Sequence, residues 1–339
     1  MQTPPVVLGI DFGGTKIATA VCDLAGNKIA SVVVDSLGAR GARVSFDHGV
    51  STAKALLAES ADGADLAAVG VATFGIPFDD RVELAPAISD WGALELGREL
   101  RAAFPGTRVE LATDAKAAAQ AEARWGALAD ADPAVYLNLG TGLAAAIVVG
   151  GRVLAGRDGA AGEIGYNLRE VADVGLADGK RIMLEDMVSG MGLQRRASSP
   201  GRYLTAADVF DRIDEADLAD LITAFVDELA FHLVNLAILV NPARIAVGGG
   251  MIRSWDRIRP RLDEALRATV PYPPDLVLAH FPHDAPLLGA VALAVDAATG
   301  IPRQQPAPTA DTPPHPDGQS WSVTSAENAT TATRIGNLS

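Results

Sequence analysis

The stretch Asp11-Phe12-Gly13-Gly14-Thr15-Lys16 lies between two apolar runs, 6–10 and 17–22. Both runs are typical of buried strands, so the stretch is a glycine-rich turn with an acid at the end of its first strand. The same design occurs again within 134–149, around Gly140-Thr141-Gly142. Two such units predict a duplicated α/β fold with two domains and a central cleft. Because glycine lets backbone N–H groups approach an anion closely, the two turns together predict a polyphosphate site between the domains.

Length, charge and cysteine content limit the class of protein. The 339 residues suffice for two domains of ordinary size. The net charge of −14 disfavours nucleic acid and anionic membranes as partners. The single cysteine, Cys22, excludes a disulfide framework and a cysteine-rich zinc site, and its apolar run predicts a small core residue. The N-terminus shows no signal-peptide pattern and the longest apolar run, within 231–240, is too short to span a bilayer, so we expect a cytoplasmic protein.

The predicted elements follow the same order twice along the chain. In the first unit we expect strands at 6–10, 17–22, 29–34, 67–73 and 108–112, with helices at 51–59, 91–104 and 114–128. In the second unit we expect three strands within 134–154, further strands at 244–247 and 276–280, and helices at 217–240, 255–268 and 285–298. The predicted domains are 1–113 with 286–300, and 114–285. The segment 301–339 is rich in Pro, Thr, Ala, Ser and Asn, which predicts a disordered tail.

The glycine turns carry the candidate nucleotide site. The first is not a Walker A loop, and a lone Gly-Gly turn between strands is more often a plain hairpin. Its pairing with a second turn favours phosphate binding, and the acid at the strand end can hold Mg²⁺ through water. A third turn follows a strand and opens a helix, where the N–H groups favour anions and the bare glycines leave room for a flat base. The predicted set is Asp11, with Mg²⁺, and Gly13, Gly14, Thr15, Lys16, Gly140, Thr141, Gly142, Gly248, Gly249 and Gly250.

Three acids are candidates for chemistry on an acceptor. Asp114 lies after a predicted strand and at the start of a helix, with Thr113 as a possible N-cap, so it can orient a hydroxyl and accept its proton. An aspartate that only stabilises the helix dipole is the alternative. Glu163, in a small-residue loop, and Glu185, in the helical stretch 184–187, can accept hydrogen bonds from sugar hydroxyls. Each of these two would otherwise be an ordinary surface acid.

Taken in order, these residues resemble the ROK family of bacterial sugar kinases, which has the actin–hexokinase ATPase fold. The resemblance covers roughly residues 6–300. The segment 11–16 is similar to the family's first phosphate turn, 139–143 to its second, and 246–250 to its adenosine-side turn. The resemblance implies ATP as phosphoryl donor, Mg²⁺ as cofactor and a homodimer as the assembly.

The acceptor site also resembles that of the family. The segment Thr-Asp-Ala-Lys-Ala-Ala-Ala at 113–119 is similar to the family's Asn-Asp-Ala-Asn-Ala-Ala, whose Asp is the catalytic base. The segment 159–165 matches the family's Gly-Ala-Ala-Gly-Glu-Ile-Gly loop, whose Glu binds sugar hydroxyls, and Glu185 falls where the family has a second sugar-binding Glu. The resemblance therefore implies Asp114 as the base, with a substrate-binding set of Gly75, Thr113, Asp114, Glu163, Tyr166 and Glu185.

Two departures from the family lie in the sugar pocket. The family's zinc- and sugar-binding His is replaced by Tyr166, and its cysteine-rich zinc segment is absent, so we expect no zinc. The family's Asn before the base is Thr113. We therefore expect an ATP-dependent kinase that phosphorylates the primary 6-hydroxyl of a hexose-like substrate other than plain glucose. A kanosamine-like amino sugar or a C7 cyclitol fits this expectation.

Alternative functions remain open at this point. One is glucokinase proper. The family also includes transcriptional repressors, which need an added helix-turn-helix before the first phosphate turn, whereas five residues precede Val6. Another is a sugar-binding protein that has lost catalysis. The presence of Asp11, Asp114 and both turns argues against it, but Thr113 and Tyr166 leave it open.

Overall fold

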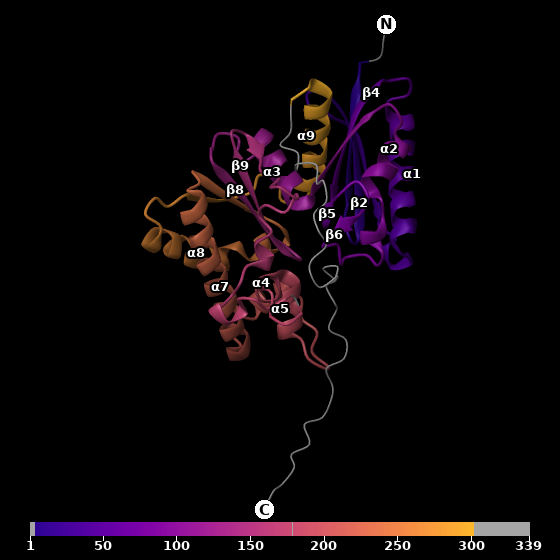
Figure 1. Ribbon diagram of the computed structural model, residues 1–339. Helices are drawn as coiled ribbons and strands as arrows, with labels where there is room; N and C mark the ends of the chain where they lie inside the picture. The colour runs from indigo at the N-terminus through magenta and orange to yellow at the C-terminus, as the bar shows by residue number, and fades with distance from the viewer. Residues whose placement is uncertain (1–3, 178, 302–339) are drawn as a thin grey trace, which may run out of the picture.

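The computed structural model describes residues 4–177 and 179–301, which form two units built on five-stranded sheets. Figure 1 shows the first unit in indigo and purple beside the second, which runs from magenta to orange. The predicted tail, apart from Ile301, lies outside the described residues. The first unit contains β1 (Val6–Phe12), β2 (Lys16–Asp23), β3 (Lys28–Asp35), α1 (Ala42–Ser60), β4 (Leu66–Thr73), β5 (Ile76–Pro77), β6 (Val82–Glu83), α2 (Leu96–Ala103), β7 (Arg108–Thr113) and α3 (Asp114–Trp125).

The second unit repeats the strand–strand–strand beginning and then carries an insertion of short helices. It contains β8 (Ala134–Leu139), β9 (Leu143–Val149), β10 (Arg152–Val153), α4 (Leu184–Met187), α5 (Gly190–Ala197), α6 (Ala206–Asp211), α7 (Ala216–Val240), β11 (Arg244–Gly248), α8 (Trp255–Thr269), β12 (Asp275–Leu278) and α9 (Ala285–Thr299). Single-turn 3₁₀ helices lie at Gly38–Arg40, Trp91–Ala93, Ile164–Tyr166, Val171–Asp173 and Gly250–Ser254.

The two sheets have the same topology. The first has the order β3-β2-β1-β4-β7 and the second has the order β10-β9-β8-β11-β12. In each, the first three strands pair antiparallel and the last two pair parallel. The duplication that the glycine turns predicted is therefore confirmed at the level of strand order. Parallel strands place their carboxyl ends at one edge of the sheet, which is where ligands bind in open α/β sheets.

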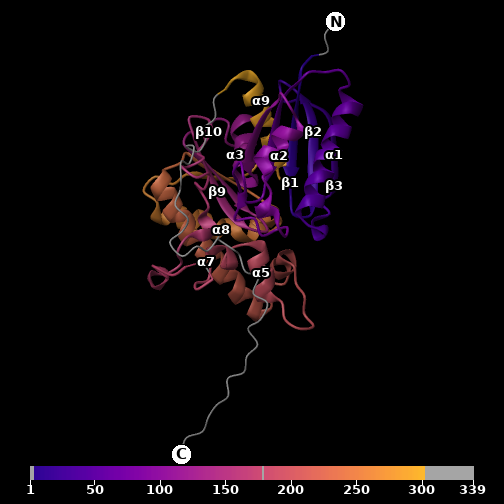
Figure 2. The same ribbon diagram turned by 45° about the vertical axis from the view of Figure 1, so that its right-hand side comes forward.

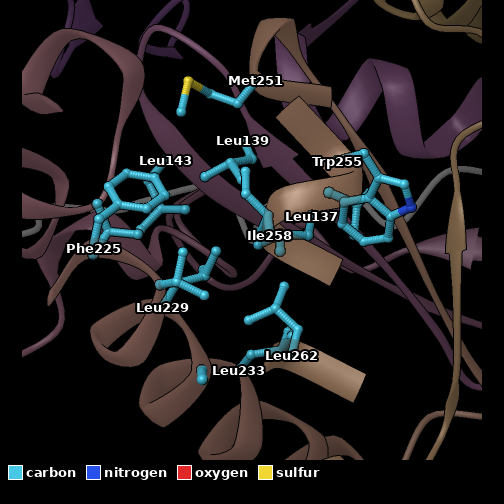
Figure 3. Packing of buried hydrophobic residues seen from close by; sticks show 14 of the residues in the cluster. Leu137, Leu139, Leu143, Phe225, Leu229, Leu233, Met251, Trp255, Ile258 and Leu262 are labelled. Carbon is cyan, nitrogen blue, oxygen red and sulfur yellow. The ribbon is translucent and has the colours of Figure 1, made fainter. Parts of the chain in front are cut away.

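Each sheet is covered by helices on both faces, and the inner helices connect the units. Helices α7 and α8 pack on one face of the second sheet, where Leu137, Phe225 and Ile258 lie in one apolar cluster (Figure 3). Helix α3 covers the opposite face of this sheet, although it follows the last strand of the first. Helix α9 ends the second unit but packs on β1, β4 and β7 of the first sheet (Figures 1 and 2).

Glycines allow α9 to lie very close to its neighbours. A Cβ atom on Gly70 of β4 would lie 1.8 Å from the Ala290 carbonyl oxygen of α9. A Cβ on Gly289 of α9 would lie 1.8 Å from the Ala117 carbonyl oxygen of α3. Both distances are far below van der Waals contact, so a larger residue at Gly70 would force α9 away from β4, and one at Gly289 would force α9 away from α3. The stack of sheet, α9 and α3 fixes where α3 begins, and with it the position of Asp114.

Several predicted boundaries were wrong. The helix expected at 51–59 begins at Ala42, because Ser45 and Gly49 on its buried face hid the apolar pattern. The single helix expected at 91–104 is a 3₁₀ turn followed by α2, since Leu94 adopts an extended backbone between them. Helices α5 and α6 were not predicted, because each is short and depends on tertiary contacts for its stability.

Helix α7 is long and apolar enough to cross a membrane by length and composition alone, and it is the one such helix within the described residues. Its apolar residues, including Leu229 and Leu233, pack against β8, β9 and α8 in the core of the second unit (Figure 3). Burial against the sheet accounts for part of this composition, whereas Phe231, Ile238 and Leu239 of the same helix are exposed. Cys22 is buried in β2 and unpaired, which confirms the predicted small core residue.

Candidate active site

Asp114 lies at the first turn of α3, directly after β7. The Thr113 hydroxyl accepts a hydrogen bond from the Lys116 backbone N–H at 3.3 Å, which confirms the predicted N-cap. The Asp114 carboxylate accepts another from the Ala115 N–H at 2.7 Å. A hydroxyl and then an acid at the start of a helix satisfy its free N–H groups and complement its dipole. The local sequence therefore both starts the helix and directs a carboxylate to the edge of the first sheet.

Asp11 and Asp114 come from different elements, and the charge of Asp114 affects the ionisation of Asp11. Asp11 is near the end of β1, opposite Ala72 of β4. Desolvation, reinforced by the charge of Asp114, raises the pKa of Asp11 to about 7. Desolvation, reinforced by the charge of Glu163, raises the pKa of Asp114 to about 6, although the Ala115 N–H opposes this shift. Two carboxylates with raised pKa values at one sheet edge are typical of a functional site.

A buried ion pair joins α3 to the small-residue loop. The Lys116 Nζ lies 3.0 Å from the Glu163 Oε1, and the two side chains are 4% and 21% exposed. Lys116 also opposes the rise in the pKa of Asp114. Sequence reasoning named Glu163 but missed Lys116, because a lysine in an alanine-rich helix is ordinarily a solvated surface residue. The departure from the family's Asn at this position was the signal that could have identified it.

Glu185 lies against the second glycine turn. Its Oε2 accepts a hydrogen bond from the Leu143 N–H at 2.8 Å. A Cβ on Gly142 would lie 2.5 Å from the same oxygen, so only glycine fits there without moving Glu185. Desolvation raises the pKa of Glu185, as do the charges of Asp186 and Glu163, whereas the Leu143 N–H lowers it. The acid predicted to bind sugar therefore also supports the turn predicted to bind phosphate.

The three glycine turns are closed by backbone hydrogen bonds, and the second and third are in contact. The Gly13 N–H donates to the Lys16 carbonyl at 2.9 Å, and the Gly140 N–H donates to the Gly142 carbonyl at 3.1 Å. Gly249 has a φ of +94°, and its Cβ would lie 2.5 Å from the Leu139 carbonyl oxygen. A Cβ on Gly250 would have no heavy atom within 4 Å. The second and third turns thus form one surface with open space above Gly250.

One side-chain hydroxyl and two backbone N–H groups also hold these turns in place, and sequence reasoning missed them. The Ser36 hydroxyl donates to the Gly14 carbonyl at 2.7 Å in the first unit. In the second unit, the N–H groups of Gly190 and Met191, at the start of α5, donate to the carbonyls of Gly140 and Thr141. Nothing in the sequence marks these contacts, since they join segments far apart in the chain.

The remaining predicted residues have less specific surroundings. Thr15, Lys16 and Thr141 are exposed, so their polar groups are free to meet a ligand. Gly75 has a φ of +76° in the turn between β4 and β5, and a Cβ would lie 2.7 Å from the Cβ of Ala85. Tyr166 is in the 3₁₀ turn after Glu163, and its carbonyl accepts a hydrogen bond from the Arg181 side chain. Their roles toward substrate and nucleotide stay predictions.

The residues at this edge fit Mg²⁺ and a nucleotide. The raised pKa values of Asp11 and Asp114 show two desolvated carboxylates that repel each other, and a divalent cation would relieve this repulsion. The open space at Gly250 suits a base, and backbone N–H groups in glycine turns suit phosphates. Within residues 4–177 and 179–301, no cluster of three or more His, Cys, Asp or Glu side chains is arranged to hold a metal ion. The absence of zinc stays a prediction.

Comparisons with known proteins define the class of this chain. The family model described as the ROK family matches residues 7–297. Kanosamine kinase from Amycolatopsis mediterranei strain S699 is 30% identical over 266 residues, which are 76% of this chain and 84% of that protein.

Solved structures agree with this match. The ROK hexokinase from Thermus thermophilus superposes with a TM-score of 0.73 at 28% identity, covering 87% of this chain and 99% of the other. A ROK family glucokinase from Streptomyces griseus, solved with glucose and AMPPNP, gives a TM-score of 0.66 at 29% identity, covering 85% and 99%.

The fold is therefore that of the actin/hexokinase-like sugar kinases, as the sequence predicted. The chain belongs to the ROK family and is a sugar kinase of the ATP-dependent phosphotransferase class.

Proposed function

We propose that this sugar kinase transfers the γ-phosphoryl group of ATP to a primary hydroxyl, either the 6-hydroxyl of an amino sugar or the equivalent hydroxymethyl group of a C7 cyclitol. The observation that carries the proposal is the group of desolvated carboxylates at the edge of the first sheet, in which Asp114 has a pKa of about 6 and interacts with Glu163. A general base works best with a pKa close to the working pH. The raised value makes Asp114 a stronger base than an exposed aspartate while it stays largely ionised at neutral pH.

The proton transfer follows from the position of Asp114. As the acceptor hydroxyl attacks the γ-phosphorus, its proton passes to the Asp114 carboxylate, and the bond between the γ-phosphorus and the β–γ bridging oxygen breaks to release ADP. Glu163 and Glu185 would bind acceptor hydroxyls and fix the attacking oxygen. The Lys116 Nζ holds one oxygen of Glu163, which leaves the other carboxylate oxygen for the acceptor.

ATP would bind to the glycine turns. The N–H groups of Gly13 and Gly140 close their own turns, so other N–H groups within 13–16 and 140–142 would contact the phosphates. Thr15, Thr141 and Lys16 would add side-chain donors, and 248–250 would face adenosine. Mg²⁺ would be held through water by Asp11, and it supplies charge neutralisation at the phosphates. The movement of one domain, 1–113 with 286–300, toward the other, 114–285, would exclude water from the site.

The charge of the site supports an amino sugar as acceptor. Asp11, Asp114, Glu163 and Glu185 outnumber the one buried lysine beside them, so a protonated amine on the acceptor gains a favourable interaction. Thr113 and Tyr166, which replace the family's Asn and His, also favour an acceptor other than plain glucose. The 30% identity to a kanosamine kinase supports the same substrate class.

A coupled ADP-release assay tests this proposal. The acceptors are kanosamine, glucosamine, glucose, mannose, N-acetylmannosamine and a C7 cyclitol, each with MgATP. We expect the highest kcat/KM with a free amino sugar or a cyclitol. A highest value with glucose would make the protein a glucokinase and contradict the substrate assignment. ADP release with none of them, despite ATP binding, would favour a sugar-binding protein without catalysis.

We also propose a cytoplasmic homodimer. Val171, Val174, Ile182 and Phe231 are 89%, 68%, 56% and 60% exposed. They lie on the segment after Tyr166 and on α7, which are joined by the ion pair between Arg169 and Glu228. Exposed apolar groups over connected elements are typical of an interaction surface. Light scattering after size-exclusion chromatography should give twice the chain mass, and Phe231→Asp should lower it to that of a monomer.

A further inference from the structure

A cavity of about 930 Å³ lies between the edge strands of the two sheets, away from the glycine turns. The residues that line it come from β7, α3, β10 and α9 and from the chain next to these elements. None of Asp11, Asp114, Glu163 and Glu185 lines it. Its volume is in the range of ligand sites for small organic molecules. We call it the β7–β10 cavity.

The β7–β10 cavity is basic, although the chain has a net charge of −14. Of the described residues that line it, two are acidic, Glu110 and Asp296, and five are basic: Arg101, Arg108, Lys116, Arg124 and Arg152. Such a concentration of positive charge raises the local concentration of anions.

The basic groups differ in how far they are neutralised. Arg101 pairs with Asp79 at 2.7 Å, and Arg124 pairs with Asp296. Arg108 donates one hydrogen bond to the Ala297 carbonyl at 3.1 Å. Within the described residues, neither Arg108 nor Arg152 forms an ion pair. Two guanidinium groups in one cavity are therefore available to an anionic ligand.

We propose that the β7–β10 cavity binds a phosphate monoester of a polyhydroxylated molecule, and that Lys116 transmits its occupancy to the acceptor site. Arginine binds phosphate oxygens through paired N–H groups, which favours Arg108 and Arg152 as the phosphate contacts. Thr107 and Gln120 also line the cavity and offer hydrogen bonds to hydroxyl groups. The cavity is several times larger than a phosphate ion, so the ligand has a body besides its phosphate.

Lys116 provides the connection. Lys116 is one of the residues that line the cavity, and its Nζ forms the ion pair with Glu163. An anion in the cavity competes with Glu163 for this ammonium group, so the ligand would loosen the carboxylate that holds the acceptor. This part of the inference rests on the proposed role of Glu163 in sugar binding. Binding in the cavity itself does not depend on that role.

The binding test uses isothermal titration calorimetry with 6-phosphogluconate, a sugar-acid phosphate that a hexose 6-kinase does not produce. Titrations are done with saturating AMPPNP and Mg²⁺, and gluconate is the probe without phosphate. We expect 6-phosphogluconate to bind and gluconate not to bind. The double variant Arg108→Gln/Arg152→Gln should weaken binding at least tenfold, whereas Arg267→Gln, which removes an arginine outside the cavity, should leave it unchanged. Thermal unfolding without probe checks that the variants fold.

Three outcomes would overturn the site. The first is equal binding by wild type and the double variant, and the second is equal binding of gluconate. The third is loss of binding in Glu185→Gln with retention in the double variant, which would place the probe in the acceptor site. Because these titrations need no turnover, a protein without kinase activity would contradict the proposed function and leave the cavity test valid.

The proposed effect of the β7–β10 cavity on the acceptor site is tested separately, through the KM of the accepted sugar. In wild type, 6-phosphogluconate should change the KM of the accepted sugar at least threefold. The change should disappear in the double variant, which no longer binds the probe, and in Lys116→Met, which lacks the connection. A change that persists in Lys116→Met would contradict the role of Lys116.

Discussion

The two units share one strand order but support their glycine turns differently. In the first unit the turn at 13–16 is held by the hydroxyl of Ser36, from the end of β3. In the second, the turn at 140–142 is held by the carboxylate of Glu185 and by the start of α5. Both supports of the second turn come from the insertion between β10 and α7, which has no counterpart in the first unit.

This difference suggests that phosphate binding and acceptor binding depend on different parts of the chain. The elements that the units have in common supply the glycine turns proposed to bind phosphate, and the first unit adds Asp11. The insertion of the second unit adds Glu163 and Glu185, which are the carboxylates assigned to the acceptor. Phosphate binding is therefore expected to be duplicated, whereas acceptor binding depends on one unit. Because Glu185 contacts the second turn, a change at this acceptor residue is expected to affect phosphate binding as well.

The largest effect is expected from Asp114, which stands at the junction of the units. Asp114→Ala removes the proposed base, so kcat should fall by roughly 10²–10⁴-fold. The measurement is ADP release with the best acceptor, and ATP affinity serves as the control because the turns are unchanged. Near-normal kcat would show that Asp114 only caps α3.

A pair of variants tests the difference between the turns directly. Glu185→Gln keeps the shape but weakens a charged hydrogen-bond acceptor, so the KM of the sugar should rise by about 10–100-fold and the KM of ATP should rise as well. Ser36→Ala, the matched change in the first unit, should raise the KM of ATP alone. Equal effects of the two variants on the sugar would remove the distinction between the units.

Lys116→Met tests the ion pair that joins α3 to the insertion. Lys116 lowers the pKa of Asp114 and Glu163 raises it, so loss of the lysine should raise the pKa of Asp114 further. The acidic limb of the pH profile of kcat/KM should move to higher pH, and the KM of the sugar should rise by roughly tenfold. An unchanged profile would mean that Lys116 has a packing role alone.

Asp11→Asn tests the desolvated carboxylate of the first unit. Its pKa is about 7 in the folded chain, whereas the reference value for an aspartate is 3.8. The protonated form therefore stabilises the fold below pH 4, and this stabilisation is lost as the pH rises to 7. Without Mg²⁺ and nucleotide, the free energy of unfolding of the variant at pH 8 should exceed that of wild type by on the order of 2–4 kcal/mol, measured by denaturant or thermal unfolding. The two proteins should converge near pH 4. A difference independent of pH would have another cause.

The parts of the fold that depend on local pattern were predictable. Strands β1 and β2, and likewise β8 and β9, are apolar runs separated by a glycine turn. Their positions agree with the prediction to within two residues. The N-cap at Thr113 was also predictable, because it involves groups three residues apart. Helix α1 and the short helices α5 and α6 were misjudged, since their stability comes from buried faces that the sequence pattern shows poorly.

By itself, the sequence determined the duplication and the glycine turns, and it identified Asp11, Asp114, Glu163 and Glu185 as the candidate acids of the site. These are properties of short segments, where residue type and spacing set the local backbone and the available chemistry. Tertiary structure alone decided that Lys116 is buried against Glu163 and that Glu185 supports the second turn. It also decided that basic side chains from β7, α3 and β10 surround one cavity. The physical reason is that pairing and desolvation of charges depend on distances between segments far apart in the chain, which the packing of α3 and α9 sets.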